Sequence, residues 1–125
     1  VERRLMTFAA ARLMSVLYLG AALAVAVAAS SNVLALVFVA LIVQEALRYG
    51  TNPLETLIAN RHDESDARAT VLSFMSQAHA MGEILGGICL GALATTTSIT
   101  TAFLVAAVVH VAAGVVVGRA AHAAA

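Results

Sequence analysis

The amino-acid sequence predicts an all-α polytopic membrane protein with four transmembrane helices arranged as two antiparallel hairpins. Of its 125 residues, 62% are hydrophobic and only 11% are charged. Soluble domains are about 45–50% apolar and about 25% charged. The hydrophobic residues fall into four long runs, and a membrane-spanning helix needs about 20 of them. Four spans joined by short connections therefore account for the whole chain.

The same composition excludes several other classes of protein. The seven basic residues are all Arg and are balanced by seven acidic residues, so no basic field is available to hold nucleic acid. The single cysteine, Cys89, excludes an intrachain disulfide and any multi-cysteine metal site. Soluble-enzyme motifs such as H-E-x-x-H and G-x-S-x-G are absent. We expect no enzymatic activity, no cofactor and no metal ion.

The apolar runs predict spans at about 8–29, 33–58, 69–94 and 99–118, with a polar loop at about 59–68. The second span allows two interpretations. In one, the span ends at Arg48 and an amphipathic segment follows. In the other, a single long helix continues to about Asn60 with a kink near Pro53, which places Arg48 near the middle of the membrane. The boundaries given above follow the second interpretation.

The arginines predict the orientation of the chain. They flank the start of the first span, lie between the second and third spans, or follow the fourth span. The connections at 30–32 and 95–101 carry no charge. Because positive residues stay inside, we expect both termini and the loop at 59–68 in the cytoplasm. The predicted location is the cell (inner) membrane, with the lipid bilayer as the main partner.

The third predicted span carries the most informative polar residues. Glu83 lies near its middle, and His79 lies four residues earlier on the same helical face, where the two side chains can share a proton. A carboxyl group in hydrocarbon is costly, so it indicates a pathway for protons or substrate. In the second span, Gln44, Glu45 and Arg48 are further pathway candidates, or else mark a polar helix end at the membrane interface.

Two other features of these spans predict helix packing. Four glycines of the third span, at spacings of four, form G-x-x-x-G pairs that favour close helix contact over gating: Gly82, Gly86, Gly87 and Gly91. His110 lies centrally in the fourth span, where an interhelical hydrogen bond is favoured over a proton relay.

Part of the chain resembles the major facilitator superfamily of transporters. The resemblance rests on Pro53-Leu54, Asn60 and the segment R-A-T-V-L-S at 68–73, followed by G-E-I-L-G-G at 82–87 and L-G-A-L-A at 90–94. The resemblance covers nearly the whole chain. The matching segments are similar to helices nine to twelve of a twelve-helix protein. It implies that the chain is a C-terminal fragment of a larger transporter, packed against the remaining helices of that protein.

In that family two six-helix halves rock about a central site. The resemblance implies alternating-access transport of a small-molecule substrate, commonly proton-coupled efflux. Two alternatives stay open. One is a complete small four-span multidrug exporter acting as a dimer, although the first span lacks the acidic residue that such exporters carry there. The other is a membrane subunit without transport activity.

Overall fold

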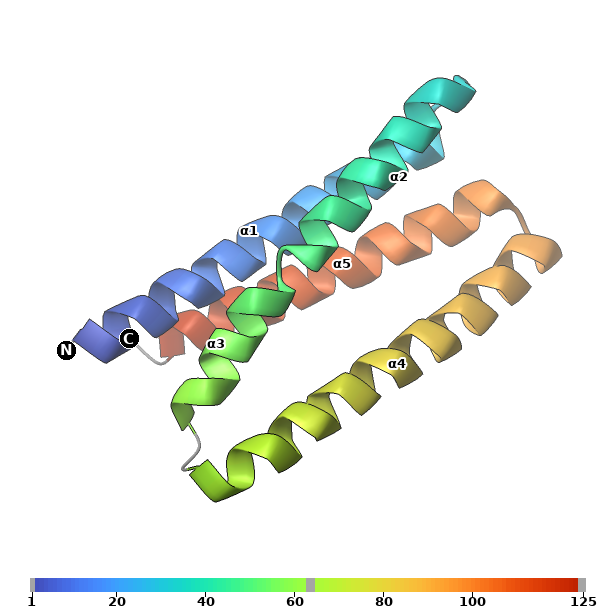
Figure 1. Ribbon diagram of the computed structural model, residues 1–125. Coiled ribbons are helices and arrows are strands. Elements are labelled where there is room, and N and C mark those ends of the chain that lie inside the picture. Colours follow the sequence, from blue (N-terminus) through green and yellow to red (C-terminus); the bar gives the residue numbers. More distant parts are fainter. Residues whose placement is uncertain (1, 63–64, 124–125) are drawn as a thin grey trace.

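The computed structural model describes residues 2–62 and 65–123, with side chains described for 6–60 and 69–122. The described residues form five α-helices and no strand: α1 (Glu2–Ser30), α2 (Leu34–Tyr49), α3 (Asn52–His62), α4 (Ser65–Thr96) and α5 (Ile99–Ala123). Both ends of the chain lie at the same end of the bundle (Figure 1), as an even number of membrane crossings requires. Helix also occupies 59–62 and 65–68 of the predicted loop, because α3 ends at His62 and α4 begins at Ser65.

Four helical segments are long and apolar enough to cross a membrane, which confirms the predicted number. They are Met6–Ser30, Leu34–Asn60, Ala69–Thr96 and Ile99–His122. The second consists of α2 and α3 together, with a break between Tyr49 and Asn52. The position of Arg48 near the middle of the membrane stays a prediction.

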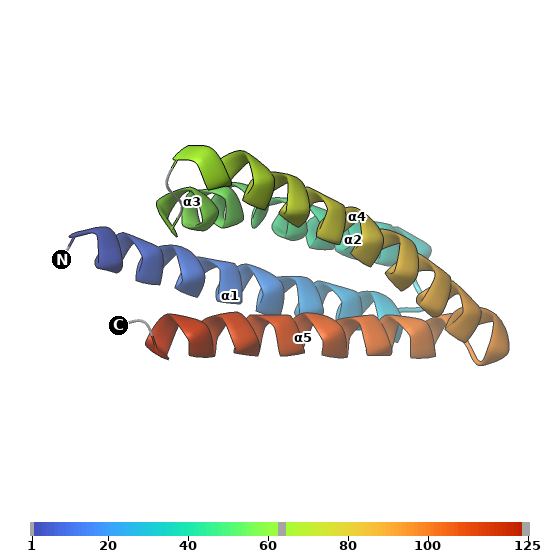
Figure 2. The same cartoon turned by 90° about the horizontal axis from the view of Figure 1, so that it is seen from below.

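The main helix contact joins the first and last spans. Helices α1 and α5 lie side by side along most of their length in both views (Figures 1 and 2). The buried apolar residues of the two helices are mostly alanine, with one methionine and one valine on α1: Ala10, Ala11, Met14, Ala21, Ala22, Ala24, Val25, Ala28, Ala102, Ala107 and Ala121. Small side chains let helix backbones approach closely, which is how helices associate in lipid.

The closest approach between α1 and α5 occurs at a G-x-x-x-G pair that differs from the predicted one. A Cβ atom added to Gly114 would lie 3.2 Å from the carbonyl oxygen of Ser15 and 3.1 Å from the side chain of Leu19. At Gly118 the nearest atom would be the Ser15 hydroxyl, at 3.0 Å. That hydroxyl donates a 2.7 Å hydrogen bond to the Gly114 carbonyl. The two glycines therefore allow the helices to approach closely, and the hydrogen bond stabilises the contact.

Helix α4 is the most exposed element of the described fold. It contacts α5 and α3, and none of its most apolar window is buried. Its exposed side chains include Phe74, Met81, Ile84 and Ile88. Most of the surface of α4 is therefore available to lipid or to further helices.

Helix α5 begins after a short connection that follows α4. The hydroxyl of Ser98 accepts a 3.0 Å hydrogen bond from the backbone N–H of Thr101, as helix-capping serines do.

Candidate functional site

Each candidate span carries a polar side chain in its central part. These residues are Tyr18 in α1, Arg48 in α2, Glu83 in α4 and His110 in α5. Polar groups are costly in hydrocarbon and mark functional sites there. Four of them in the central parts of the spans make this level of the bundle the candidate site.

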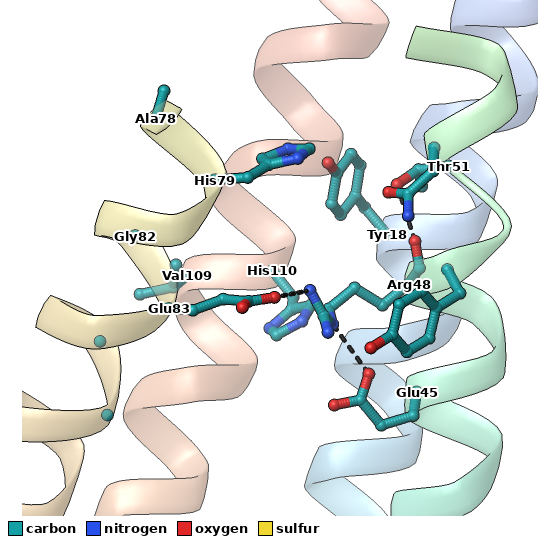
Figure 3. A pocket seen from close by; sticks show the side chains of 14 residues that line it. Tyr18, Glu45, Arg48, Thr51, Ala78, His79, Gly82, Glu83, Val109 and His110 are labelled. Carbon is teal, nitrogen blue, oxygen red and sulfur yellow. Dashed lines mark hydrogen bonds and ion pairs between the residues drawn. The ribbon is translucent and has the colours of Figure 1, made fainter. Parts of the chain in front are cut away.

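Arg48 lies between two carboxylates at this level. Its Nε donates to Oε2 of Glu45 at 2.8 Å, and its Nη1 donates to Oε1 of Glu83 at 2.9 Å. Glu45 lies one helical turn before Arg48, whereas Glu83 reaches across from α4 (Figure 3). The guanidinium also lies over the ring of Tyr49, 4.7 Å from its centroid. Arginine suits this role because its planar group presents several donors at fixed angles.

A second polar cluster, formed by Tyr18, Glu55 and His79, joins α1, α3 and α4. The hydroxyl of Tyr18 donates to Oε1 of Glu55 at 3.0 Å. The other carboxylate oxygen, Oε2, lies 3.1 Å from Nε2 of His79. Only 12% of the Glu55 side chain is exposed, against 50% for Glu45 and 61% for Glu83. Glu55 is thus the most enclosed of these carboxylates, and both of its oxygens have partners.

The two clusters border one pocket of about 700 Å³ between the helices. In Figure 3 the side chains of Tyr18 and His79 point toward one another on one side of it, with Arg48 and Glu83 nearby. The rest of the lining includes Glu45, Tyr49, Thr51, Asn52, Ala78, Gly82, Gly86, Gly87, Val109 and His110. A pocket of this size accommodates a small organic molecule.

The second span is interrupted where it passes this pocket. Helix α2 ends at Tyr49 and α3 begins at Asn52. The carbonyl oxygen of Arg48 accepts both the backbone N–H of Thr51 at 3.1 Å and its hydroxyl at 2.8 Å. Pro53 has no N–H to donate to the preceding turn, so the helix cannot continue regularly through this point. The buried Thr51 side chain supplies a donor that the interrupted backbone needs inside a membrane.

Charge balance in the pocket is negative. Glu45 and Glu83 share the single positive charge of Arg48, which leaves one negative charge uncompensated among the described residues of that cluster. Glu55 adds a second, which only a protonated His79 offsets. An uncompensated charge in hydrocarbon is costly unless it is protonated, paired or hydrated. The site is therefore suited to take up a proton or another cation.

Four of the five predicted pathway residues border the pocket. Glu45, Arg48, His79 and Glu83 line it, whereas Gln44 is half-exposed and does not. The two polar side chains of α4 have separate partners in the structure: Glu83 bonds to Arg48, and His79 lies against Glu55. Spacing within one helix could not reveal that other helices supply better partners.

The predicted interhelical hydrogen bond of His110 is not made within the described residues and stays a prediction for helices beyond them. Its Nδ1 lies 2.8 Å from the carbonyl oxygen of Ala106, four residues earlier in the same helix. One ring nitrogen, Nδ1, therefore has its partner within α5, while the His110 side chain also lines the pocket. A histidine in a helix interior has this local option whenever its ring turns back along the helix.

The four glycines of α4 meet no neighbour within the described chain. A Cβ atom added to Gly82, Gly86, Gly87 or Gly91 would have no atom of a packing neighbour within 4 Å. Three of them instead line the pocket: Gly82, Gly86 and Gly87. Close packing at these positions stays a prediction that concerns helices beyond the described residues.

Two residues of the site, Tyr18 and Glu55, are not among the candidates predicted from the sequence. The available signal was an acidic residue inside the second span if that span continues to Asn60. Their partnership depends on the packing of α1 beside α3, which no local pattern in the sequence indicates.

Comparisons with protein families, with curated proteins and with solved structures find no match for this chain.

Proposed function

We propose that this chain forms part of a secondary transporter that moves a small organic solute across the membrane by alternating access. The observation that carries the proposal is the Arg48–Glu83 ion pair, which lies in the central parts of two candidate spans beside a pocket of about 700 Å³. Charged residues inside spans typically mark substrate or ion pathways and face a cavity. The sequence resemblance to the major facilitator superfamily supports the same function, with these spans as the last third of the parent protein.

The interrupted second span supports this function independently. Substrate sites of secondary transporters lie near the bilayer midplane, beside helices whose regular hydrogen bonding is broken. Here the break between Tyr49 and Asn52 borders the pocket. Because the two halves of the span are joined by an irregular segment, α3 can tilt relative to α2 with little loss of hydrogen bonding. Such movement is what opens a site to one side at a time.

The charge balance favours a cationic solute exchanged for protons. The excess of carboxylates over Arg48 attracts positive charge, and a proton taken up by the adjoining Glu55–His79 pair reduces the negative charge of the same site. A cation and a proton therefore compete for one site, which is the requirement for proton-coupled efflux. A neutral solute gains nothing from these charges, and an anion is repelled by them.

The proposed arrangement places the two helical hairpins, α1–α2 and α4–α5, with both chain ends in the cytoplasm of the cell (inner) membrane. Supporting observations are the packing of α1 against α2, the contact between α4 and α5, and the segregation of Arg to one set of connections. The exposed surface of α4 is then covered by the remaining helices of the transporter.

Transport by the purified full-length protein in liposomes tests the proposal. Ethidium serves as the cationic probe and fluorescein as an anionic probe of similar size, each followed under an imposed pH gradient. We expect gradient-driven movement of ethidium, and at least a several-fold slower rate for Glu83→Gln. Arg119→Gln is the matched control, because Arg119 is exposed near the end of α5 and away from the pocket. Equal rates with protein and with empty liposomes for both probes would reject the proposal.

A further inference from the structure

The two polar clusters of the pocket differ in how their charge is compensated. Arg48 carries a permanent positive charge, and Glu45 and Glu83 both pair with it. Glu55 has no arginine within hydrogen-bonding distance among the described side chains. Its partners are a tyrosine hydroxyl and an imidazole. Only the imidazole ordinarily gains or loses a charge between about pH 5 and 8.

We propose that Glu55, His79 and Tyr18 form the proton-binding site of this protein, and that Glu83 does not carry the coupling proton. The claim that this proton is coupled to transport rests on the proposed function. The claim that the contact between Glu55 and His79 depends on protonation does not. The three side chains come from α3, α4 and α1. The site therefore joins three elements at a single carboxylate.

The proton movement is simple to balance. A proton from water on one side of the membrane bonds to the free ring nitrogen of His79, whose other nitrogen already faces Glu55. The pair changes from one net negative charge to an ion pair with no net charge. The same proton later leaves to water on the opposite side, and nothing is oxidised or reduced. The His79 side chain is 57% exposed and lines the pocket, so water can reach its ring.

The location of Glu55 gives this proton a mechanical effect. Glu55 lies on α3, the short helix beyond the break in the second span, while His79 lies on α4. Protonation of His79 strengthens the attraction between these two helices. Loss of the proton leaves Glu55 with neutral hydrogen-bond donors, and α3 can move at the irregular segment Gly50–Thr51. The state of one imidazole thus controls how firmly α3 is held against α4.

Other titratable groups near His79 are accounted for. From α2, Glu45, Arg48 and Tyr49 line the same pocket, with the two charged side chains paired to each other. From α4 itself, Glu83 is bonded to Arg48. From α5, His110 lies across the pocket with one ring nitrogen directed to its own helix. Of these groups, none is placed against Glu55 as His79 is.

A distance measurement tests the inference without requiring transport. Spin labels are attached at Leu57 on α3 and Phe74 on α4, both exposed, in a Cys89→Ala background of the purified full-length protein. We expect the distance between labels to lengthen as the pH is raised from 5 to 8. The change should vanish in Glu55→Gln and persist in Glu83→Gln. His79→Gln probes the same contact from α4, so poor folding of one variant does not leave the question open.

Ethidium exchange at equal pH on both sides provides the second measurement. We expect the wild-type exchange rate to vary with pH, and the ratio of rates at pH 6 and pH 8 to fall to about one in Glu55→Gln and His79→Gln. Glu83→Gln should be slower at both values but keep the wild-type ratio. A pH-dependent label distance that survives Glu55→Gln and His79→Gln overturns the inference. A wild-type distance that responds to pH without any transport overturns the proposed function alone.

Discussion

Arg48 on α2 and Glu83 on α4 form an ion pair with 2.9 Å between donor and acceptor atoms, although α4 packs along α5 and α3. The pair connects α2 to the most exposed helix of the described fold, which α3 also contacts. Both residues lie in the central parts of their candidate spans. The pair joins α2 to α4 without a large packed interface between these two helices, so a ligand can replace it.

Removal of the cation should be more damaging than removal of one anion. Arg48→Gln leaves Glu45 and Glu83 facing each other without compensation, whereas Glu83→Gln leaves the neutral pair of Arg48 with Glu45. Because uncompensated charge is costly in hydrocarbon, we expect a several-fold lower yield of folded protein for Arg48→Gln than for Glu83→Gln. Size-exclusion chromatography of the membrane extract measures this yield. Similar yields for the two variants would show that the cluster is well hydrated.

The two sets of glycines should respond differently to an added methyl group. At Gly114 the methyl group would meet a backbone oxygen at 3.2 Å, so Gly114→Ala should destabilise the fold by about 1–3 kcal/mol. Gly86→Ala meets no neighbour within the described chain and should be neutral, or stabilise by up to about 1 kcal/mol through helix propensity. Thermal unfolding of the detergent-solubilised chain compares them. A larger loss at Gly86 would instead locate a packing partner on α4.

The break in the second span should depend on Pro53. In Pro53→Ala the restored N–H can bond to the carbonyl of Tyr49, which favours a continuous helix. We expect slower amide hydrogen exchange at residues 50–55 and slower transport, because α3 loses freedom to move. Pro53→Gly is the control, since it restores the same donor without favouring helix. If exchange at 50–55 is as fast in Pro53→Ala as in the wild type, the break is set by Gly50 and Thr51.

Chemical labelling should reveal which connections face outward. In a Cys89→Ala background, Asn32→Cys and Thr97→Cys place single thiols in the two uncharged connections. We expect both to react with a membrane-impermeant maleimide added to intact cells, because the arginine-bearing connections remain in the cytoplasm. Reaction only after the cells are broken would invert the orientation.

The sequence was sufficient to predict the four spans, because hydropathy acts on each segment separately. It also identified Glu45, Arg48, His79 and Glu83 as polar residues at membrane depth, and the structure brings them to one pocket. Their partners could not be predicted in the same way. Whether His79 faces Glu83 or Glu55 depends on how α3 packs, and a helical-wheel argument considers one helix at a time.

Similarly, the sequence contains two sets of G-x-x-x-G spacing, and nothing in the spacing says which set meets a neighbour. The pair Gly114 and Gly118 meets α1 because Ser15 and Leu19 lie opposite it. Those contacts join segments about a hundred residues apart in sequence. Local patterns therefore indicate which surfaces can approach closely, while the choice of partner is a property of the whole bundle.

The buried alanines of α1 have a consequence for how this protein tolerates mutation. Ala21 and Ala28 are 0% and 3% exposed, whereas the outward residues Leu23 and Val108 are each 67% exposed. In a soluble protein, hydrophobic side chains are favoured in the interior and charged side chains at the surface. Here both sides are apolar, so bulk alone separates tolerated from harmful replacements along these helices: valine at Ala21 is more disruptive than phenylalanine at Leu23.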